Sequence, residues 1–158
     1  MIQNDFMKKI LFVCHGNICR SPMAEFIMKK IVQDAGLESQ FEIHSAATSS
    51  EEIGNEMHFG AKEKLKNMKI PFCEHKARHI TEEDYAYYDF LIGMDLENLY
   101  YMEKKWNKDP DEKCSLLLSY AGKDRDIADP WYTGNFDKTY EDIMLGCKAL
   151  LNKIAYAF

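Results

Sequence analysis

A short apolar run followed at once by a polar turn and a helix start is the feature that most limits how this chain can fold. Residues 10–13 (Ile-Leu-Phe-Val) are continuously apolar, which is typical of a strand buried on both faces of a parallel sheet. A glycine-containing turn follows over residues 14–20, and Ser21 and Pro22 then occupy the places of a helix N-cap and first helical residue. Strand, turn and helix in this order predict an α/β fold.

Strands and helices alternate along the rest of the chain, which favours a parallel sheet covered by helices. The first helix should end near Gly36. Thr81 and Asp84 have the spacing of a capping box, and Asp95 can cap the helix that follows it. The remaining strands are expected at residues 41–46, 70–72, 90–94 and 115–120, and the remaining helices at about 56–67, from 81 onward, at 96–106 and at 140–154.

Length and composition fit one globular domain and exclude several classes of protein. The chain has 158 residues, 46% hydrophobic and 29% charged, with a mean hydropathy of -0.43. No apolar run approaches the roughly 18 residues of a membrane span. The net charge of -6 disfavours a broad surface for nucleic acid or anionic lipid. We expect one domain over residues 8–158, an N-terminal extension over residues 1–7 without the pattern of a signal peptide, and no nucleic-acid or membrane partner.

The cysteines indicate a reduced, cytoplasmic protein. There are five of them, an odd number, scattered along a chain long enough to fold without disulfides. Cys14 and Cys19 have a spacing that zinc sites use, but no second close cysteine or histidine pair accompanies them. We therefore expect no metal and no cofactor. Cys73, Cys114 and Cys147 are interpreted as structural.

The turn after the first strand has the properties of an anion-binding loop. In an open α/β sheet, ligands bind beyond the carboxyl ends of the strands, which is where residues 14–21 lie. Backbone N–H groups of such a loop and of the helix start form a concave cradle for an anion, and Gly16 and Asn17 tolerate the positive φ that it requires. The pKa of a Cys14 thiol there would fall from about 8.5 toward the range of about 3.5 to 7.5, which makes it a nucleophile at neutral pH.

Two further groups complete a chemistry of phosphoryl transfer to sulfur. Arg20 can donate two N–H groups to two oxygens of a bound phosphate. Asp129 is the best candidate to protonate the leaving oxygen and later activate water, because Pro130 stiffens its loop and Trp131 and Tyr132 offer flat apolar surface to an aromatic leaving group. The alternative is a buried cysteine, a surface arginine and a simple Asp-Pro turn. The Cys-x5-Arg spacing alone is weak evidence, and its strand, turn and helix context makes it specific.

Four motifs resemble those of the low-molecular-weight protein tyrosine phosphatases, and the resemblance covers nearly the whole chain. They are residues 13–22 (Val-Cys-His-Gly-Asn-Ile-Cys-Arg-Ser-Pro), 45–48 (Ser-Ala-Ala-Thr), 93–95 (Gly-Met-Asp) and 129–131 (Asp-Pro-Trp). The resemblance implies a single-domain, three-layer αβα fold with a four-stranded parallel sheet flanked by helices. It also implies metal-independent hydrolysis of phosphotyrosine in proteins, and of small aryl phosphates, through a phosphocysteine intermediate. Cys14 would be the nucleophile, Arg20 the phosphate clamp and Asp129 the general acid and base.

The resemblance also assigns support around the loop. Ser21 would hydrogen-bond the thiolate. Asn17 would be held in a left-handed conformation by Ser21, Ser45 and a histidine, for which we choose His75 over His79. The expected phosphate- and substrate-binding residues are His15, Gly16, Asn17, Ile18, Cys19, Ser21, Glu51, Trp131 and Tyr132.

A second loop cysteine is a further implication of the resemblance. Cys19 corresponds to a residue that can form a disulfide with Cys14 under oxidation and so protect it from irreversible sulfinic acid, and simple packing is the alternative. Two departures from the family pattern concern the substrate, because His15 stands where many members carry an aliphatic residue and Glu51 where several carry an aromatic one. Glu51 either repels acidic sequences beside a phosphotyrosine or points into water.

Other functions were weighed against this interpretation. An arsenate reductase of related fold needs a cysteine where this chain has Gly93 and Met94. A non-catalytic anion-binding module needs neither Cys14 nor Asp129. No G-x4-G-K-[ST] pattern is present, which excludes a P-loop kinase or GTPase. We expect an enzyme that acts as a monomer.

Overall fold

The central strand of the sheet is β1 (Lys8–Cys14), which lies between β2 (Phe41–Ala47) and β3 (Phe90–Gly93) in the computed structural model. β4 (Cys114–Leu116) pairs with the other edge of β3, so the order is β2-β1-β3-β4, and every pair is parallel. The structure describes residues 7–156. The expected α/β class and four-stranded parallel sheet are confirmed.

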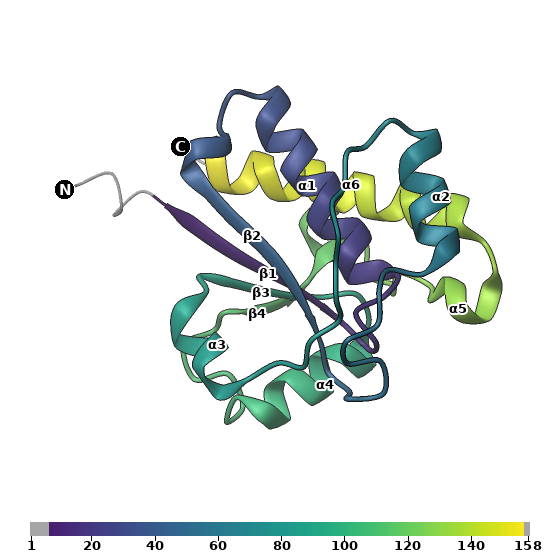
Figure 1. The fold of residues 1–158 in the computed structure, drawn as a ribbon. Helices are drawn as coiled ribbons and strands as arrows, with labels where there is room; N and C mark the ends of the chain where they lie inside the picture. Colours follow the sequence, from purple (N-terminus) through teal and green to yellow (C-terminus); the bar gives the residue numbers. More distant parts are fainter. Residues whose placement is uncertain (1–6, 157–158) are drawn as a thin grey trace.

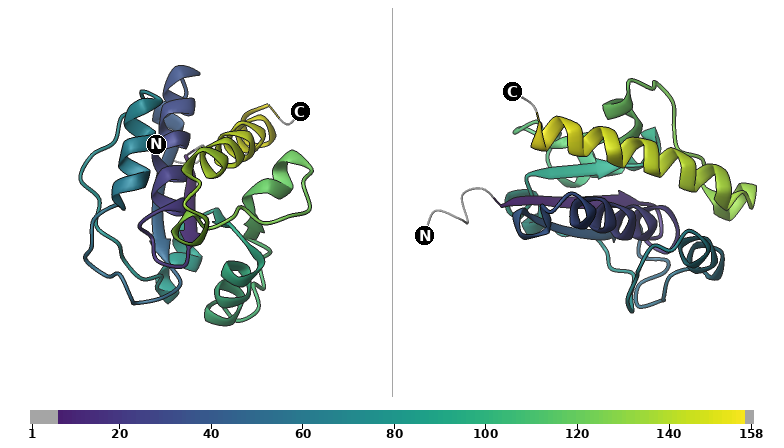
Figure 2. Two further views of the ribbon diagram at one scale, coloured as in Figure 1. Left: turned by 90° about the vertical axis from the view of Figure 1, so that its right-hand side faces the viewer. Right: turned by 90° about the horizontal axis from the view of Figure 1, so that it is seen from above.

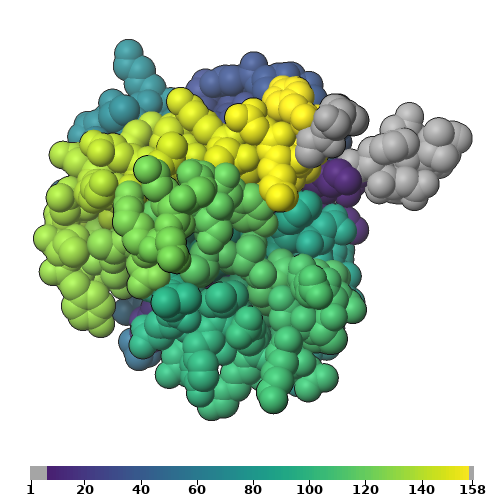
Figure 3. All heavy atoms as spheres, turned by 180° about the vertical axis from the view of Figure 1, so that it is seen from behind, coloured from purple at the N-terminus to yellow at the C-terminus, as the bar shows by residue number. Residues whose placement is uncertain are grey.

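Helices cover both faces of this sheet and give the single domain three layers (Figures 1 and 2). On one face lie α1 (Arg20–Asp34) and α6 (Phe136–Ala155), with α2 (Phe59–Asn67) packed beside them. The other face carries α3 (Glu82–Tyr87) and α4 (Leu96–Lys105). The view from behind shows α6 running across the top of the molecule (Figure 3).

The continuous apolar run in β1 is explained by burial on both faces. Ile10 and Phe12 are 0% exposed and pack in the core formed with α1 and α6. Leu11 and Val13, which point the other way, are also 0% exposed and pack with residues of α3 and α4. Because successive side chains of a strand alternate between faces, a central strand covered on both sides leaves no position for a polar residue.

The ends of several helices match the expected signals. α1 ends at Asp34, and Gly36 follows with φ 74°. Capping boxes begin α3 at Thr81 and α4 at Asp95. The expected N-cap of α1 is wrong, because the helix begins at Arg20, and the Ser21 hydroxyl lies 3.1 Å from Cys14 Sγ instead of capping.

Two expected strands are absent or shorter in the described part of the chain. Residues 70–72 form no strand, because this segment packs on α1, where the Phe72 and Phe26 rings lie 6.2 Å apart, away from any sheet edge. Sheet pairing in residues 115–120 stops at Leu116. The chain continues as a 3-10 helix, η3 (Leu117–Ala121), whose first two leucines enter the core.

Helix boundaries also differ from expectation near the site. α2 begins at Phe59 rather than near residue 56, since His58 caps it, and α6 begins at Phe136, capped by Asn135, rather than at residue 140. Two short elements were not expected, η2 (Glu38–Gln40) and α5 (Pro130–Thr133).

The ends of the chain and its cysteines were also the subject of predictions. Residues 1–6 of the predicted N-terminal extension lie outside the described residues. Within the described range, no helix is long and apolar enough to cross a membrane. The five cysteines are free thiols; Cys14 ends β1 and Cys19 lies in the loop after it.

Candidate active site

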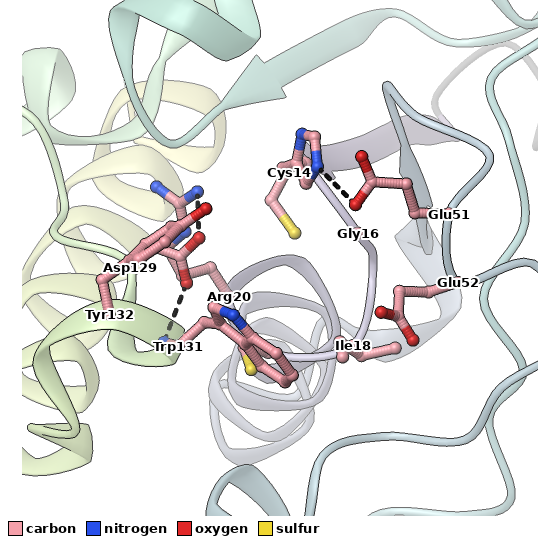
Figure 4. A pocket seen from close by; sticks show the side chains of 11 residues that line it. Cys14, Gly16, Ile18, Arg20, Glu51, Glu52, Asp129, Trp131 and Tyr132 are labelled. Atoms are coloured by element: carbon pink, nitrogen blue, oxygen red, sulfur yellow. Dashed lines mark hydrogen bonds and ion pairs between the residues drawn. The ribbon is translucent and has the colours of Figure 1, made fainter.

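The loop between β1 and α1 lies at the carboxyl edge of the sheet, where the strand order reverses around β1. Such a switch point is where open α/β sheets form ligand sites. A cavity of about 100 Å³ opens there, between the loop, the segment after β2 and the start of α5 (Figure 4). Its lining residues are Cys14, His15, Gly16, Ile18, Cys19, Arg20, Glu51, Glu52, Asp129, Trp131 and Tyr132.

Cys14 ends β1 with its sulfur inside a set of donors. The side chain points toward the cavity in Figure 4, and the residue is 3% exposed. The backbone N–H groups of Asn17 and Ser21 donate to Cys14 Sγ at 3.3 Å and 3.4 Å, and Ser21 Oγ lies 3.1 Å from the sulfur. These groups can all stabilise negative charge on sulfur.

The side chain of Asn17 stabilises the conformation of the loop. It has φ 60°, a left-handed conformation, and is 0% exposed. Its amide Nδ2 donates to Ser21 Oγ at 2.7 Å and to Ser45 Oγ at 3.0 Å, while Oδ1 accepts from Arg78 N at 3.1 Å. His75 Nε2 lies 2.8 Å from the Asn17 carbonyl oxygen. One buried amide therefore joins the loop to β2 and to the segment after α2.

Asn17 has the expected positive φ, but the same expectation for Gly16 is wrong. Gly16 is not among the residues of positive φ, so it is not needed for a left-handed turn. A Cβ at this position would lie 3.3 Å from Glu52 Cγ, which is a tight contact. Gly16 thus serves the close approach of the segment after β2 to the loop.

Two further groups extend the support of the loop. Ser45 Oγ donates to Glu25 Oε1 at 2.6 Å, and Glu25, which is 7% exposed, is also paired with Lys29 at 2.7 Å. His79, the alternative to His75, instead lies 3.0 Å from the Thr48 carbonyl oxygen through Nε2. No sequence pattern pointed to Glu25, because a carboxylate on a helix is usually solvated.

Arg20 is buried and faces two carboxylates that come from distant parts of the chain. Its NH1 donates to Asp95 Oδ2 at 2.7 Å and to the Ile127 carbonyl oxygen at 2.8 Å, and NH2 lies 3.4 Å from Asp129 Oδ2. Burial lowers the pKa of the Arg20 guanidinium, but the charges of Cys14, Asp95 and Asp129 raise it, and the net shift is upward. Arg20 is therefore a fixed positive charge inside an acidic protein.

One donor of this arginine is unused. Arg20 Nε is buried and has no hydrogen-bond partner among residues 7–156. A buried donor without a partner is costly and rare in folded proteins. Since Arg20 lines the cavity, this donor fits an oxygen of an anion bound there.

Asp129 begins α5 and stands across the cavity from Cys14 (Figure 4). Its Oδ1 accepts from Trp131 N at 3.0 Å, the N-cap contact of the short helix, and its Oδ2 faces Arg20. The carboxylate is 23% exposed, so it can exchange a proton with water. Pro130 occupies the first turn of α5, as its fixed φ favours.

The rim of the cavity combines aromatic and charged groups. Trp131 is 57% and Tyr132 82% exposed, and the apolar Ile18 faces them from the loop (Figure 4). Glu51 Oε1 lies 3.2 Å from His15 Nε2, so the two residues that depart from the family pattern contact each other. The Glu51 side chain is 69% exposed, and its contact with His15 was not predicted from the sequence.

Cys19 faces the cavity from the base of α1 and is 4% exposed. Burial raises the pKa of its thiol, and the negative charges of Cys14 and Asp129 raise it further. Cys19 therefore stays protonated beside the reactive group.

The cavity differs from the expected set of binding residues in three respects. Asn17 and Ser21 are 0% exposed and do not line the cavity, although their backbone N–H groups donate to Cys14 Sγ. Glu52 lines the cavity and was not expected, and Asp95 contacts Arg20 although it was expected only as a helix cap. No group of three or more His, Cys, Asp or Glu side chains within the described range is placed to hold a metal ion.

Fold and site together define an αβα protein with a cysteine-containing anion-binding loop at the switch point of its sheet. The family model for low molecular weight phosphotyrosine protein phosphatase matches residues 9–157. The human protein of that name is 40% identical over 151 residues, covering 92% of this chain and 95% of the relative. The chain belongs to the low molecular weight phosphotyrosine protein phosphatase family, which confirms the predicted resemblance.

Solved structures agree with this assignment. The crystal structure of YfkJ from Bacillus subtilis superposes with a TM-score of 0.92 at 37% identity, covering 96% of each chain. The crystal structure of DARP, a Drosophila arginine phosphatase, gives a TM-score of 0.84 at 32% identity, covering 91% of this chain and 96% of that one.

Proposed function

We propose that the protein hydrolyses phosphotyrosine, in proteins and in small aryl phosphates, through a phosphocysteine intermediate. In the first step the Cys14 thiolate attacks phosphorus, the S–P bond forms and the P–O bond to the phenol breaks. The electron pair of that bond stays on the phenolic oxygen, which takes the proton of the Asp129 carboxylic acid. Arg20 binds two phosphoryl oxygens through Nε and NH2 and stabilises their charge in the transition state.

The second step restores the enzyme. Water attacks the phosphorus of phosphocysteine, the Asp129 carboxylate takes a proton from that water, and the S–P bond breaks to release inorganic phosphate. The Cys14 thiolate is regenerated, and the N–H groups of Asn17 and Ser21 stabilise its charge. The Ser21 hydroxyl can donate to the thiolate as well, since it lies 3.1 Å away.

The observation that carries this proposal is the unused Nε of Arg20. A buried guanidinium already holds two carboxylates, yet it keeps a free donor on the cavity that Cys14 and Asp129 share. A purely structural arginine would have its donors satisfied by protein. An anion with several oxygens, placed against the loop, accounts for all three residues.

The walls of the cavity favour an aromatic phosphoester. Ile18, Trp131 and Tyr132 offer apolar and flat surfaces, which suit a phenyl ring. Phosphoarginine is the comparison substrate, because one similar structure is that of an arginine phosphatase. A phosphoarginine peptide hydrolysed faster than the matching phosphotyrosine peptide would overturn the substrate assignment.

The experiment that tests the mechanism compares leaving groups. Asp129→Asn should lower kcat/KM for phenyl phosphate, a poor leaving group, by about 10²- to 10⁴-fold, and much less for p-nitrophenyl phosphate. Asp124→Asn, which removes a charge from an exposed residue nearby, is the matched control and should leave both values unchanged. Equal loss for the two substrates would remove Asp129 from the acid role. Cys14→Ser should abolish turnover, and activity should persist with a chelator present.

Three further properties concern the domain limits, the compartment and the oligomeric state. We infer that the domain spans residues 8–158, since β1 begins at Lys8, that the protein works in the cytoplasm, and that it is a monomer. Five free thiols fit a reducing compartment. Size-exclusion chromatography with light scattering tests the monomer.

A further inference from the structure

A cluster of three aromatic rings lies beside the cavity and outside the proposed catalytic set. It consists of His58, Trp131 and Phe136, which we call the His58 cluster. The His58 ring stacks on Phe136, with centroids 5.4 Å apart and an interplanar angle of 25°. Its edge meets Trp131 at 5.7 Å and 82°. The cluster thereby joins the start of α2, the short helix α5 and the start of α6, which are neighbours in Figure 1.

His58 is also bound to the phosphate loop through its backbone. Its N–H donates to the Ile18 carbonyl oxygen at 2.8 Å. The side chain is held as well, because Nδ1 accepts from Gly60 N at 2.9 Å and caps α2. An N–H group can only donate, so Nδ1 is unprotonated in this arrangement. Both the backbone and the ring of His58 are therefore fixed relative to the loop.

The segment that leads to Asp129 is anchored in the core, because Ile127 N donates to the Met94 carbonyl oxygen at 3.0 Å and Thr139 Oγ1 donates to the Ala128 carbonyl oxygen at 3.2 Å. The two residues after Pro130 are exposed and lack such anchors to the core. α5 is a single turn, and Trp131 is 57% exposed. The backbone N–H of Trp131 donates to Asp129 Oδ1 at 3.0 Å, so a movement of the Trp131 backbone moves the carboxylate. The carboxylate's other contact is with Arg20 Nη2, at 3.4 Å, and a bound phosphate can accept from the same donor.

The chain is shaped to let the rings meet. A Cβ at residue 60 would lie 2.4 Å from Phe136 Cε2, a distance that real Cβ atoms do not show. Gly60 has no requirement for positive φ, so its use here is the close approach of the α6 ring to the start of α2. Phe136 is half-buried and packs against the core, so the space at Gly60 lets its ring reach His58.

We propose that His58 is a positioning residue that sets the distance between the phosphate loop and Asp129. Its backbone fixes it to Ile18, and its ring fixes Trp131, whose N–H orients the Asp129 carboxylate. This inference rests on the proposed function, because it gives His58 a role only if Asp129 is the general acid. Loss of the ring should free the acid segment and slow the steps that need a placed proton.

Two variants separate the ring from the cap. His58→Asn keeps a side-chain acceptor for Gly60 N and removes the ring, while His58→Phe keeps a ring and removes the acceptor. The ratio of kcat/KM for phenyl phosphate to that for p-nitrophenyl phosphate is the readout. It reports the first step, since hydrolysis of phosphocysteine is common to both substrates, and the ratio does not depend on the fraction of folded enzyme.

The expected result follows from the size of an aromatic pair, which changes an equilibrium about two- to tenfold. His58→Asn should lower the ratio about fivefold, in the direction of Asp129→Asn, and His58→Phe should restore it. His44→Asn is the matched control: the His44 ring meets Tyr88 at 6.2 Å in a similar edge contact on the other face of β2, and its loss should leave the ratio unchanged.

Three outcomes decide between the explanations. A ratio unchanged in His58→Asn, while Asp129→Asn lowers it, overturns the positioning role and leaves the proposed function standing. A loss of ratio in His58→Phe equal to that in His58→Asn assigns the effect to the cap of α2 and also overturns the proposal. If Asp129→Asn itself shows no dependence on the leaving group, the proposed function fails and the inference falls with it.

Discussion

Replacing Asn17 by alanine tests whether one buried amide sets the shape of the phosphate loop. The residue is 0% exposed at φ 60°, and its side chain makes three hydrogen bonds of 2.7 to 3.1 Å to Ser21, Ser45 and the backbone of Arg78. Alanine keeps the Cβ and removes every one of these contacts. The partners left behind are buried or half-buried, so water does not replace the lost bonds freely.

The lost contacts and the backbone conformation together set the change in the free energy of unfolding. Each hydrogen bond contributes about 1 kcal/mol to the free energy of unfolding. The left-handed conformation costs alanine about 1 kcal/mol, whereas asparagine tolerates it. Asn17→Ala should therefore destabilise the protein by about 4 kcal/mol. At about 2 to 4 °C per kcal/mol for a chain of this size, the Tm should fall by roughly 8 to 16 °C.

The assay is urea unfolding followed by circular dichroism, with two companion variants. Asn17→Gly loses the same hydrogen bonds without the backbone strain, so it should be about 1 kcal/mol more stable than Asn17→Ala. Asn152→Ala, on the exposed side of α6, is the matched control and should change the free energy of unfolding by less than about 0.5 kcal/mol. A loss below about 1 kcal/mol in Asn17→Ala, or a glycine variant no more stable than the alanine one, would refute the reasoning.

Two further predictions concern pH and oxidation. Arg125 donates two hydrogen bonds of 2.9 Å to Asp142. Burial raises the pKa of that carboxyl, but the hydrogen bonds and charges of Arg125 and Lys138 together outweigh burial, and the net shift is downward. The stabilisation is thus present above the ordinary pKa of about 3.9 and is lost as pH falls through the lowered value, so Asp142→Asn should cost about 2 kcal/mol at pH 6 and much less at pH 2. Urea midpoints at the two values check this, and an equal loss at both contradicts it. Under peroxide, we expect Cys14 to be oxidised to a sulfenic acid, the Cys19 sulfur to displace water and form a disulfide, and a thiol reductant to restore the enzyme. Phosphatase activity after peroxide and then dithiothreitol should recover in the wild type and in Cys73→Ser but not in Cys19→Ser; recovery in Cys19→Ser would leave packing as the role of that residue.

Short-range physical chemistry explains what the sequence predicted well. The apolar run of β1 allows no exposed face, and the capping box of Thr81 and Asp84 and the N-cap Asp95 require only neighbours within one turn. Asn17 in a left-handed turn is a local preference of its side chain. The wrong strand predictions also come from local sequence. Residues 70–72 and 117–120 have a strand-like composition, but neither segment pairs with a strand of the sheet.

The α/β class, the loop after β1 and, through motif resemblance, the family can all be predicted from the sequence. Which distant groups meet depends on how the elements pack. Arg20 contacts Asp95 and Asp129 because β1 and β3 end at the same edge of the sheet and α5 begins there. No local sequence pattern encodes this arrangement. His58 and Glu52 gave no signal for the same reason, since a single histidine or glutamate is ordinary on a surface. Contacts between residues far apart depend on how whole elements pack, so their partners emerge only when the sheet and its helices are assembled.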